Sequence, residues 1–229
     1  MTVRATLLIG LLICQSGALG AEEPHHALTR ADRLEYRSAN EIVVWELQGW
    51  YGSDLHKFWW KAEGDAGSGV SDESSFQLLY SHAVSAYFDV QMGAAFEDHI
   101  TDEDLALVVG IQGLMPYNIE VDATAFLTDH GDFLIRGELE KEVLLTQRIV
   151  LLPRIRLHAS LQDIPDRPTD RGINDAAIEL RLGYKAHHKA VPYLGVSWQR
   201  TFGSAGRALR QAGEDDSFAS VVAGVRFWF

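Results

Sequence analysis

The fold is decided most clearly by the stretch Ala177-Ile178-Glu179-Leu180-Arg181-Leu182-Gly183-Tyr184-Lys185, in which apolar and polar residues alternate. Successive side chains of a β-strand point to opposite faces, so this stretch predicts a strand with one apolar and one charged face. The apolar face carries Ile178, Leu180, Leu182 and Tyr184. A chain built from such strands is all-β, with a sheet that hides one face from water.

The same alternation continues from Leu34 to Phe229, and no helix is expected to interrupt it. It predicts about twelve strands. They are expected near residues 31–37, 42–51, 56–66, 74–83, 86–99, 104–114, 118–128, 132–145, 148–161, 174–187, 190–202 and 217–229. Most are long enough for the roughly 9 to 11 residues that a tilted strand needs to cross a bilayer. The predicted fold is an antiparallel, up-and-down transmembrane β-barrel.

The connections between these strands support the barrel. Short turns such as His188-Lys189 alternate with longer loops such as Gln162 to Ile173 and Gly203 to Asp216. Bacterial outer-membrane barrels have short periplasmic turns and longer extracellular loops, and an even strand number puts both termini on the short-turn side. The chain ends on the aromatic Phe229, which resembles the terminal assembly signal of outer-membrane barrels. Closure of the sheet satisfies the backbone groups of this last strand, which lipid cannot do.

The amino-terminal residues read as an export signal. Arg4, the apolar run Ala5 to Ile13 and the small residues Ala18 and Gly20 predict a signal peptide at 1–20 that is cleaved. We divide the rest into a short periplasmic tail, 21–30, and a barrel, 31–229. The only cysteine, Cys14, lies in the signal, so disulfides and thiolate metal sites are excluded from the mature chain. The formal net charge of −12 disfavours nucleic acid as a partner.

The histidines are the candidate metal ligands. His25 and His26, beside Glu22 and Glu23, offer the nitrogen and oxygen donors that Cu(II) accepts, although adjacent histidines on a tail are commonly plain surface residues. His158 is expected to point into the barrel lumen, as a metal ligand or in a structural hydrogen bond. His56, His82 and His187-His188 lie near short turns, where they are either ordinary turn residues or a diffuse copper-facing collar.

A hairpin centred on Gln147 fixes the surroundings of His158. It predicts three cross-strand pairs, Glu140 with Arg154, Glu138 with Arg156, and Arg136 with His158. The first two pair opposite charges and stabilise the register. The third places a cation beside His158, which disfavours a metal ion there.

No catalytic residues are predicted. Ser81 and His82 are adjacent in one strand and therefore lie on opposite faces, and neither Gly-x-Ser-x-Gly nor His-Glu-x-x-His occurs. A non-enzymatic protein is expected, and an outer-membrane hydrolase is the least favoured alternative.

Several motifs recur at the spacing of a known family. They are Trp50-Tyr51-Gly52-Ser53-Asp54 followed by Lys57, Trp59-Trp60, Lys61 and Glu63-Gly64; Leu79-Tyr80-Ser81; Gly113 to Tyr117; Glu120 to Phe126; Leu144 to Arg148; Pro192 to Val196 with Trp198; Gly213-Glu214-Asp215; and Gly224 to Phe229. Through them the chain resembles the copper resistance protein B (CopB) family of outer-membrane proteins, over nearly all of Asp32 to Phe229.

The resemblance implies an outer-membrane location in a Gram-negative bacterium, copper ions as the bound ligand, and a role in copper tolerance or homeostasis. Outer-membrane lipid and periplasmic copper-handling proteins are the expected partners. The Met- and His-rich segment that family members often carry before the barrel is almost absent here, because the tail offers only His25 and His26. A passive small-solute pore is the alternative function.

Overall fold

The computed structural model describes residues 24–39, 41–67, 73–98, 103–164, 169–186 and 189–229. The predicted signal peptide at 1–20, Glu22 and Glu23 of the tail, His99 and His187-His188 lie outside these residues.

Nearly all of the described chain is β-strand. The segments are β1 (His26–Arg37), β2 (Ile42–Gly52), β3 (His56–Gly67), β4 (Glu73–Ala83), β5 (Phe88–Asp98), β6 (Glu103–Met115), β7 (Ile119–Thr128), β8 (Phe133–Lys141), β9 (Val143–Leu144), β10 (Ile149–Ser160), β11 (Gly172–Tyr184), β12 (Ala190–Thr201) and β13 (Ser217–Trp228), with one helix, α1 (Gly203–Ala212).

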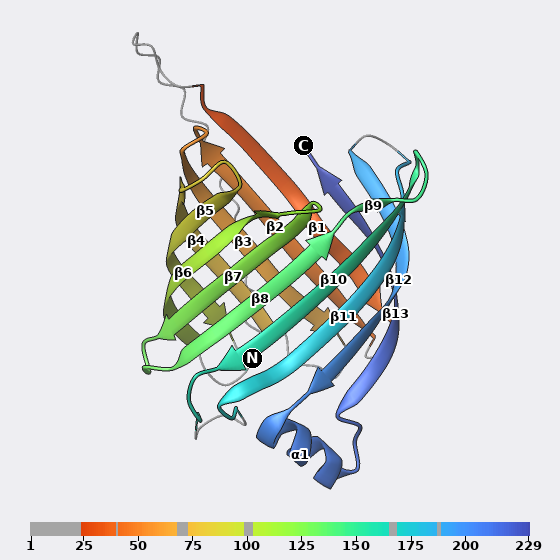
Figure 1. The fold of residues 1–229 in the computed structure, drawn as a ribbon. Helices are drawn as coiled ribbons and strands as arrows, with labels where there is room; N and C mark the ends of the chain where they lie inside the picture. The colour runs from red at the N-terminus through yellow and green to blue at the C-terminus, as the bar shows by residue number, and fades with distance from the viewer. Residues whose placement is uncertain (1–23, 40, 68–72, 99–102, 165–168, 187–188) are drawn as a thin grey trace, which may run out of the picture.

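The strands form one closed barrel. Consecutive strands pair antiparallel, and β13 pairs with β1, so the sheet formed by the described residues has no free edge (Figure 1). β8 and β9 both pair with β10 and are interrupted only at Glu142, so they count as one strand of the barrel. Among the described residues, the thirteen labelled segments therefore make twelve strands. The prediction of an antiparallel up-and-down barrel of about twelve strands is confirmed.

The first strand begins earlier than expected. Residues 26–30, which the sequence assigned to the tail, already pair with β2, from His26 opposite Gly52 to Arg30 opposite Gln48. The alternation in this part is weak, because its apolar residues are small or widely spaced. His26 therefore belongs to the wall of the barrel.

A helix, α1, occupies the long connection between β12 and β13, where the sequence analysis expected none. It ends at Gly213, whose left-handed φ of 82° lets the backbone N–H groups of Gly213 and Glu214 reach the carbonyls of Arg210 and Leu209. Arg207 also pairs with Asp170 at 2.8 Å, which ties the helix to the neighbouring loop. No helix in the described ranges is long and apolar enough to cross a membrane.

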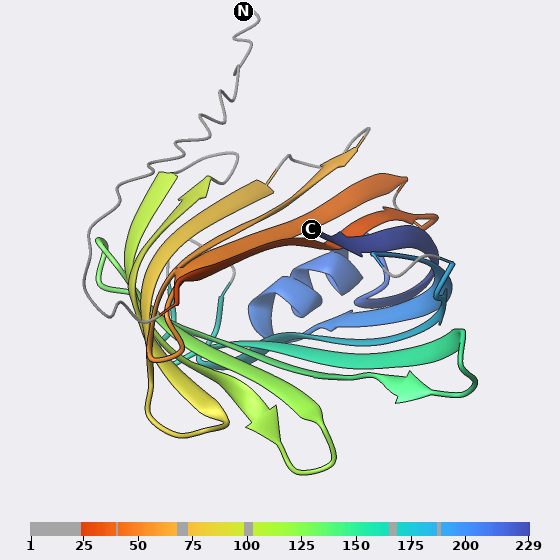
Figure 2. The same cartoon turned by 90° about the horizontal axis from the view of Figure 1, so that it is seen from above.

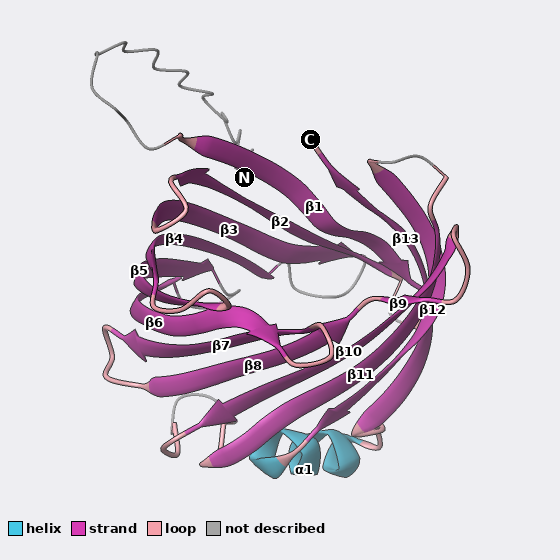
Figure 3. Ribbon diagram, turned by 45° about the horizontal axis from the view of Figure 1, so that its top comes forward, coloured by secondary structure: helices cyan, strands magenta, loops and turns pink. Residues whose placement is uncertain are grey.

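The two ends of the barrel differ. Turns at 53–55, 84–87, 116–118 and 145–148 lie at one end, together with the start of β1 and the C-terminus; we call this the short-turn rim. The loop 161–171 and α1 lie at the other end, the long-loop rim, and the C-terminus and α1 are seen at opposite ends in Figure 3.

The barrel wall has an apolar outside and a polar inside. The residues predicted to form the apolar face of β11 are exposed, from Leu180 at 44% to Ile178 at 50%, whereas Glu179 and Arg181 between them are buried. Leu107, Val109, Leu194 and Val196 continue the exposed apolar surface on other strands. The predicted assignment of the two faces is confirmed.

Candidate functional site

The lumen is crossed by a cluster of buried and half-buried arginines and glutamates, which we call the lumen lattice. Its members are Arg33, Glu35, Arg37, Glu46, Arg154, Arg156, Glu179 and Arg181. Glu179 lies at its centre, and its two carboxylate oxygens accept hydrogen bonds from four arginines. The donors are Arg181 at 2.7 Å, Arg37 at 2.9 Å, Arg156 at 3.2 Å and Arg33 at 3.3 Å. Such charge-assisted bonds compensate the desolvation of the buried charges.

Small residues on β12 and β13 make room for the lattice. These two strands separate β11 from β1, and between Glu179 and Arg37 they turn mostly small side chains inward, namely Gly195, Ser197 and Ser220 beside Val222. A Cβ added at Gly195 would lie 2.5 Å from the Leu180 carbonyl oxygen and 3.0 Å from Cγ of Arg181. The long side chains of β1 and β11 can therefore meet over β12 and β13, whose inward side chains are short.

A shift of register in β1 turns two of its charged side chains toward the lumen. The strand shifts register against both neighbours between Ala31 and Leu34, and Ala31, Asp32 and Arg33 are buried one after another. A β-bulge of this kind redirects side chains. It brings both Asp32 and Arg33 to the inner face, where Arg33 reaches Glu179 and Glu46.

The lattice spans the lumen as far as β2. Arg154 of β10 donates to Glu46 of β2 at 2.9 Å, and four strands lie between β10 and β2 on that side of the barrel. Arg154 also pairs with Glu138, and Arg156 approaches Glu46 to 3.7 Å. The charged groups thus close off one part of the interior.

The predicted hairpin register is confirmed, but the arginines do not all bind the carboxylates that lie directly opposite them. Glu140 lies opposite Arg154, Glu138 opposite Arg156, and Arg136 opposite His158. Arg154, however, pairs diagonally with Glu138 and stands 3.9 Å from Glu140, while Arg156 reaches Glu179.

The rest of the lumen encloses a cavity of about 960 Å³. Arg154 and Arg156 form part of its wall, and β3 and β7 supply polar groups such as Lys61, which binds Asp122 at 2.6 Å. In the view down the barrel in Figure 2, α1 lies on the side of the later strands, and it contacts β11 and β12. The lumen lattice therefore fills one part of the interior, and the cavity occupies the other part.

His158 points into this cavity, as predicted. Its Nδ1 lies 2.9 Å from Oδ2 of Asp175, and the neighbouring Arg136 is held by Glu63 and Glu97. The single imidazole and carboxylate suit a structural hydrogen bond, and metal binding at His158 stays a prediction.

His25 and His26 lie at the short-turn rim. The ring of His25 stacks on Tyr51 of β2, with 5.6 Å between centroids, and both histidines are exposed. They belong to the rim of the barrel and not to a separate tail. Copper binding by this pair also stays a prediction.

The structure brings His56 and His82 together at the same rim. They are register partners on β3 and β4, and their rings stack with centroids 4.8 Å apart. The sequence placed them near two different turns. The adjacent Ser81 faces inward, is fully buried and donates to Asp89 at 3.1 Å, so Ser81 and His82 lie on opposite faces as predicted.

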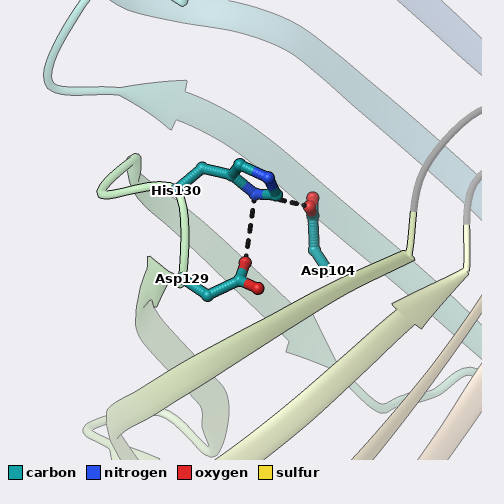
Figure 4. A group of neighbouring side chains, drawn as sticks. All are labelled: Asp104, Asp129 and His130. Atoms are coloured by element: carbon teal, nitrogen blue, oxygen red, sulfur yellow. Dashed lines mark ion pairs between the residues drawn. The ribbon is translucent and has the colours of Figure 1, made fainter.

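A further group, formed by Asp104, Asp129 and His130, lies at the long-loop rim. Nδ1 of His130 stands 3.1 Å from Asp129 and 3.3 Å from Asp104, and the three side chains converge in Figure 4. Their donor atoms lie within 4.8 Å of one another, a spacing that suits one cation. Only the adjacency of Asp129 and His130 could have signalled this group in the sequence.

The closed twelve-stranded barrel, with its apolar exterior and charged lumen, defines a porin-like β-barrel protein. Solved structures with the same fold include the KdgM porin, with a TM-score of 0.52 and 12% identity over 89% of this chain and 99% of that one. The NanC porin gives a TM-score of 0.58 and 14% identity over 88% and 99%. At these identities the likeness concerns the fold.

The particular family follows from sequence comparison. The model of "Copper resistance protein B precursor (CopB)" matches residues 25–229, so the chain belongs to the copper resistance protein B family. Copper resistance protein B of Escherichia coli is 32% identical over 88% of this chain and 69% of its own length. The homolog from Pseudomonas syringae pv. tomato is 33% identical over 87% and 68%. The resemblance noted from the sequence motifs is confirmed.

Proposed function

We propose that this chain is exported through a cleaved signal, inserts into the outer membrane and supports copper tolerance by binding copper ions at its periplasmic face, without catalysing a reaction. The observation that carries the proposal is membership of the copper resistance protein B family over residues 25–229. The exposed apolar residues on the barrel wall favour a lipid environment, because contiguous surfaces of this kind mark membrane contact.

We infer the direction of the barrel in the membrane from the usual pattern of bacterial outer-membrane barrels. Short turns and both chain ends face the periplasm in bacterial outer-membrane barrels, which would put His25, His26, His56 and His82 on the periplasmic side. Imidazole suits copper, whereas Cu(I)-selective thioethers are scarce in this chain. Copper released from periplasmic proteins would meet these histidines first.

A passive small-solute pore is the second candidate, because the lumen holds a cavity of about 960 Å³ and the fold is shared with porins. The lumen lattice argues against a wide channel, since it joins β10 to β2.

Growth on copper separates the two candidates. A copper-sensitive strain lacking its own family member should regain tolerance when it expresses this chain. A variant with all four rim histidines His25, His26, His56 and His82 changed to Ala should restore less tolerance at equal outer-membrane levels. Full restoration by that variant would favour the pore, and no restoration by the unmodified chain would contradict the copper role.

A further inference from the structure

We infer that His56 and His82, supported by Tyr80, form a Cu(II) site on the outside of the short-turn rim; this inference rests on the proposed copper function and assigns its ligands. The two histidines are direct register partners on the antiparallel strands β3 and β4. Opposite residues of such strands have Cβ atoms about 4.5 to 5.5 Å apart, close enough for two side chains to share one ion. Their rings already stack 4.8 Å apart, with both side chains exposed.

Local structure holds the pair at the rim. His56 begins β3 directly after the turn at Ser53, where Ser53 N–H donates to the His56 carbonyl at 2.8 Å and His56 N–H donates to the Ser53 hydroxyl at 3.3 Å. The backbone N–H of Ala83, the residue after His82, donates to the Leu55 carbonyl at 3.0 Å. The two histidine backbones are therefore tied to each other by the turn, and only the imidazole rings need to rotate to bind an ion.

Tyr80 positions one of the rings. Its hydroxyl lies 2.5 Å from Nδ1 of His56, and the two rings stack with centroids 5.9 Å apart. In the tautomer in which Nδ1–H donates to the phenol oxygen, the lone pair of Nε2 is left for a metal, as in other histidines that are held by a hydrogen-bond partner and bind a metal. Tyr80 is thus a positioning residue for His56.

The surroundings suit a cation. Lys57, next to His56 in sequence, points to the opposite face of β3 and binds Asp89 in the lumen at 2.8 Å. Its charge is therefore neutralised on the other side of the wall. Two imidazole nitrogens, completed by water, match the preference of Cu(II) for nitrogen and oxygen ligands in tetragonal geometry.

The other histidine groups are poorer copper sites. His158 is a single imidazole whose Nδ1 is already engaged by Asp175 at 2.9 Å, and no second histidine stands opposite it, because its register partner on β8 is Arg136. His25 stacks on Tyr51, and its neighbour His26 begins a strand in which adjacent residues point to opposite faces. His130 is joined by two carboxylates, a set that suits harder cations, and it lies at the opposite rim.

The test is Cu(II) titration of the folded protein in detergent micelles, with electron paramagnetic resonance to count coordinated nitrogens. The unmodified chain should bind one Cu(II) at this site with two imidazole nitrogens. His56→Ala and His82→Ala should each weaken that binding by about tenfold or more and reduce the nitrogen count. Tyr80→Phe should weaken binding while the nitrogen count stays unchanged.

Matched controls are His130→Ala at the opposite rim and the double variant His25→Ala/His26→Ala, both of which should keep the two-nitrogen signal. Heat-dependent migration on gels verifies that each barrel is folded, and if one single variant fails to fold the other still tests the site. If the unmodified chain binds Cu(II) and His56→Ala and His82→Ala bind it equally well, the assignment is wrong while the proposed function stands. If the unmodified chain binds no Cu(II), both are wrong.

Discussion

Arg37 on β1 donates a hydrogen bond of 2.9 Å to Glu179 on β11, although 142 residues of sequence and two strands, β12 and β13, separate them. This bond exists only because the barrel is closed by the pairing of β13 with β1. It joins the first strand of the barrel to one of the last, and it lies in the middle of a lattice whose other arginines bind the same carboxylate. Glu179 is therefore expected to hold the filled part of the lumen together.

Replacing Glu179 by Gln should destabilise the barrel and change its ion selectivity. Four arginines would lose their shared carboxylate, and breaking a buried ion pair by removing one partner costs about 3 to 5 kcal/mol. Unfolding in urea measures this loss, and reversal potentials in planar bilayers should shift toward anions. Glu142→Gln is the control, because Glu142 is an exposed partner of Lys185 and should change neither quantity. Equal behaviour of the two variants would contradict the central role of Glu179.

The double variant Arg154→Ser/Arg156→Ser should open the lumen. These arginines connect β10 to Glu46 on β2 and to Glu179 on β11, so their loss removes the groups that cross the interior. We expect a small conductance in the unmodified protein, a larger one in the double variant, and lower stability, since the buried carboxylates would lose partners. Arg148→Ser, at an exposed turn, is the control. A large, unselective conductance of the unmodified protein would refute the closed lumen and favour the passive pore.

Leu180→Arg or Leu182→Arg should impair folding into lipid. Both side chains lie on the exposed apolar face of β11, where a cation at the bilayer midplane costs about 2 to 4 kcal/mol. The control is Gln199→Arg, which places the same charge at a residue that lines the lumen cavity and should cost less. Folding efficiency into vesicles measures the difference. If all three variants fold equally well, the lipid-facing and lumen-facing sides have been assigned wrongly.

Phe229→Ser should reduce insertion in cells and leave folding into detergent largely intact. The backbone of Phe229 closes the barrel by exchanging hydrogen bonds with Thr29, at 3.1 and 3.4 Å, and these bonds do not need the side chain. The aromatic ring is exposed beside Phe227, where it is available to an assembly factor. Outer-membrane levels in cells, compared with folding in micelles, test this separation. Normal cellular levels of the variant would count against an assembly role.

Much of the barrel follows from the sequence alone because alternation and short turns are local signals. The turn at 145–148 fixes the register of the strands beside it, so the pairing of Glu140 with Arg154 could be predicted. The turn does not fix side-chain rotamers, and Arg154 in fact reaches diagonally to Glu138. Register is a backbone property, whereas the choice among several nearby carboxylates depends on the packed lumen.

The parts that escaped prediction depend on contacts between distant segments or on weak local patterns. The bonds of Glu179 to Arg33 and Arg37 need barrel closure and the small residues of β12 and β13. The pairing of His56 with His82 is set by the register of β3 against β4, in which the first residue of β3 lies opposite a residue near the end of β4. The helix Gly203–Ala212 contains two glycines, which lower its helix propensity.

Equilibrium Cu(II) titration of the folded chain decides whether the barrel binds copper. The tail should be altered by substitution and not by deletion of residues 21–30, because residues 26–30 pair with β2. We expect saturable Cu(II) binding by the unmodified protein, and strongly reduced binding when His25, His26, His56 and His82 are all changed to Ala. Copper binding no greater than that of an unrelated barrel of equal size would contradict it.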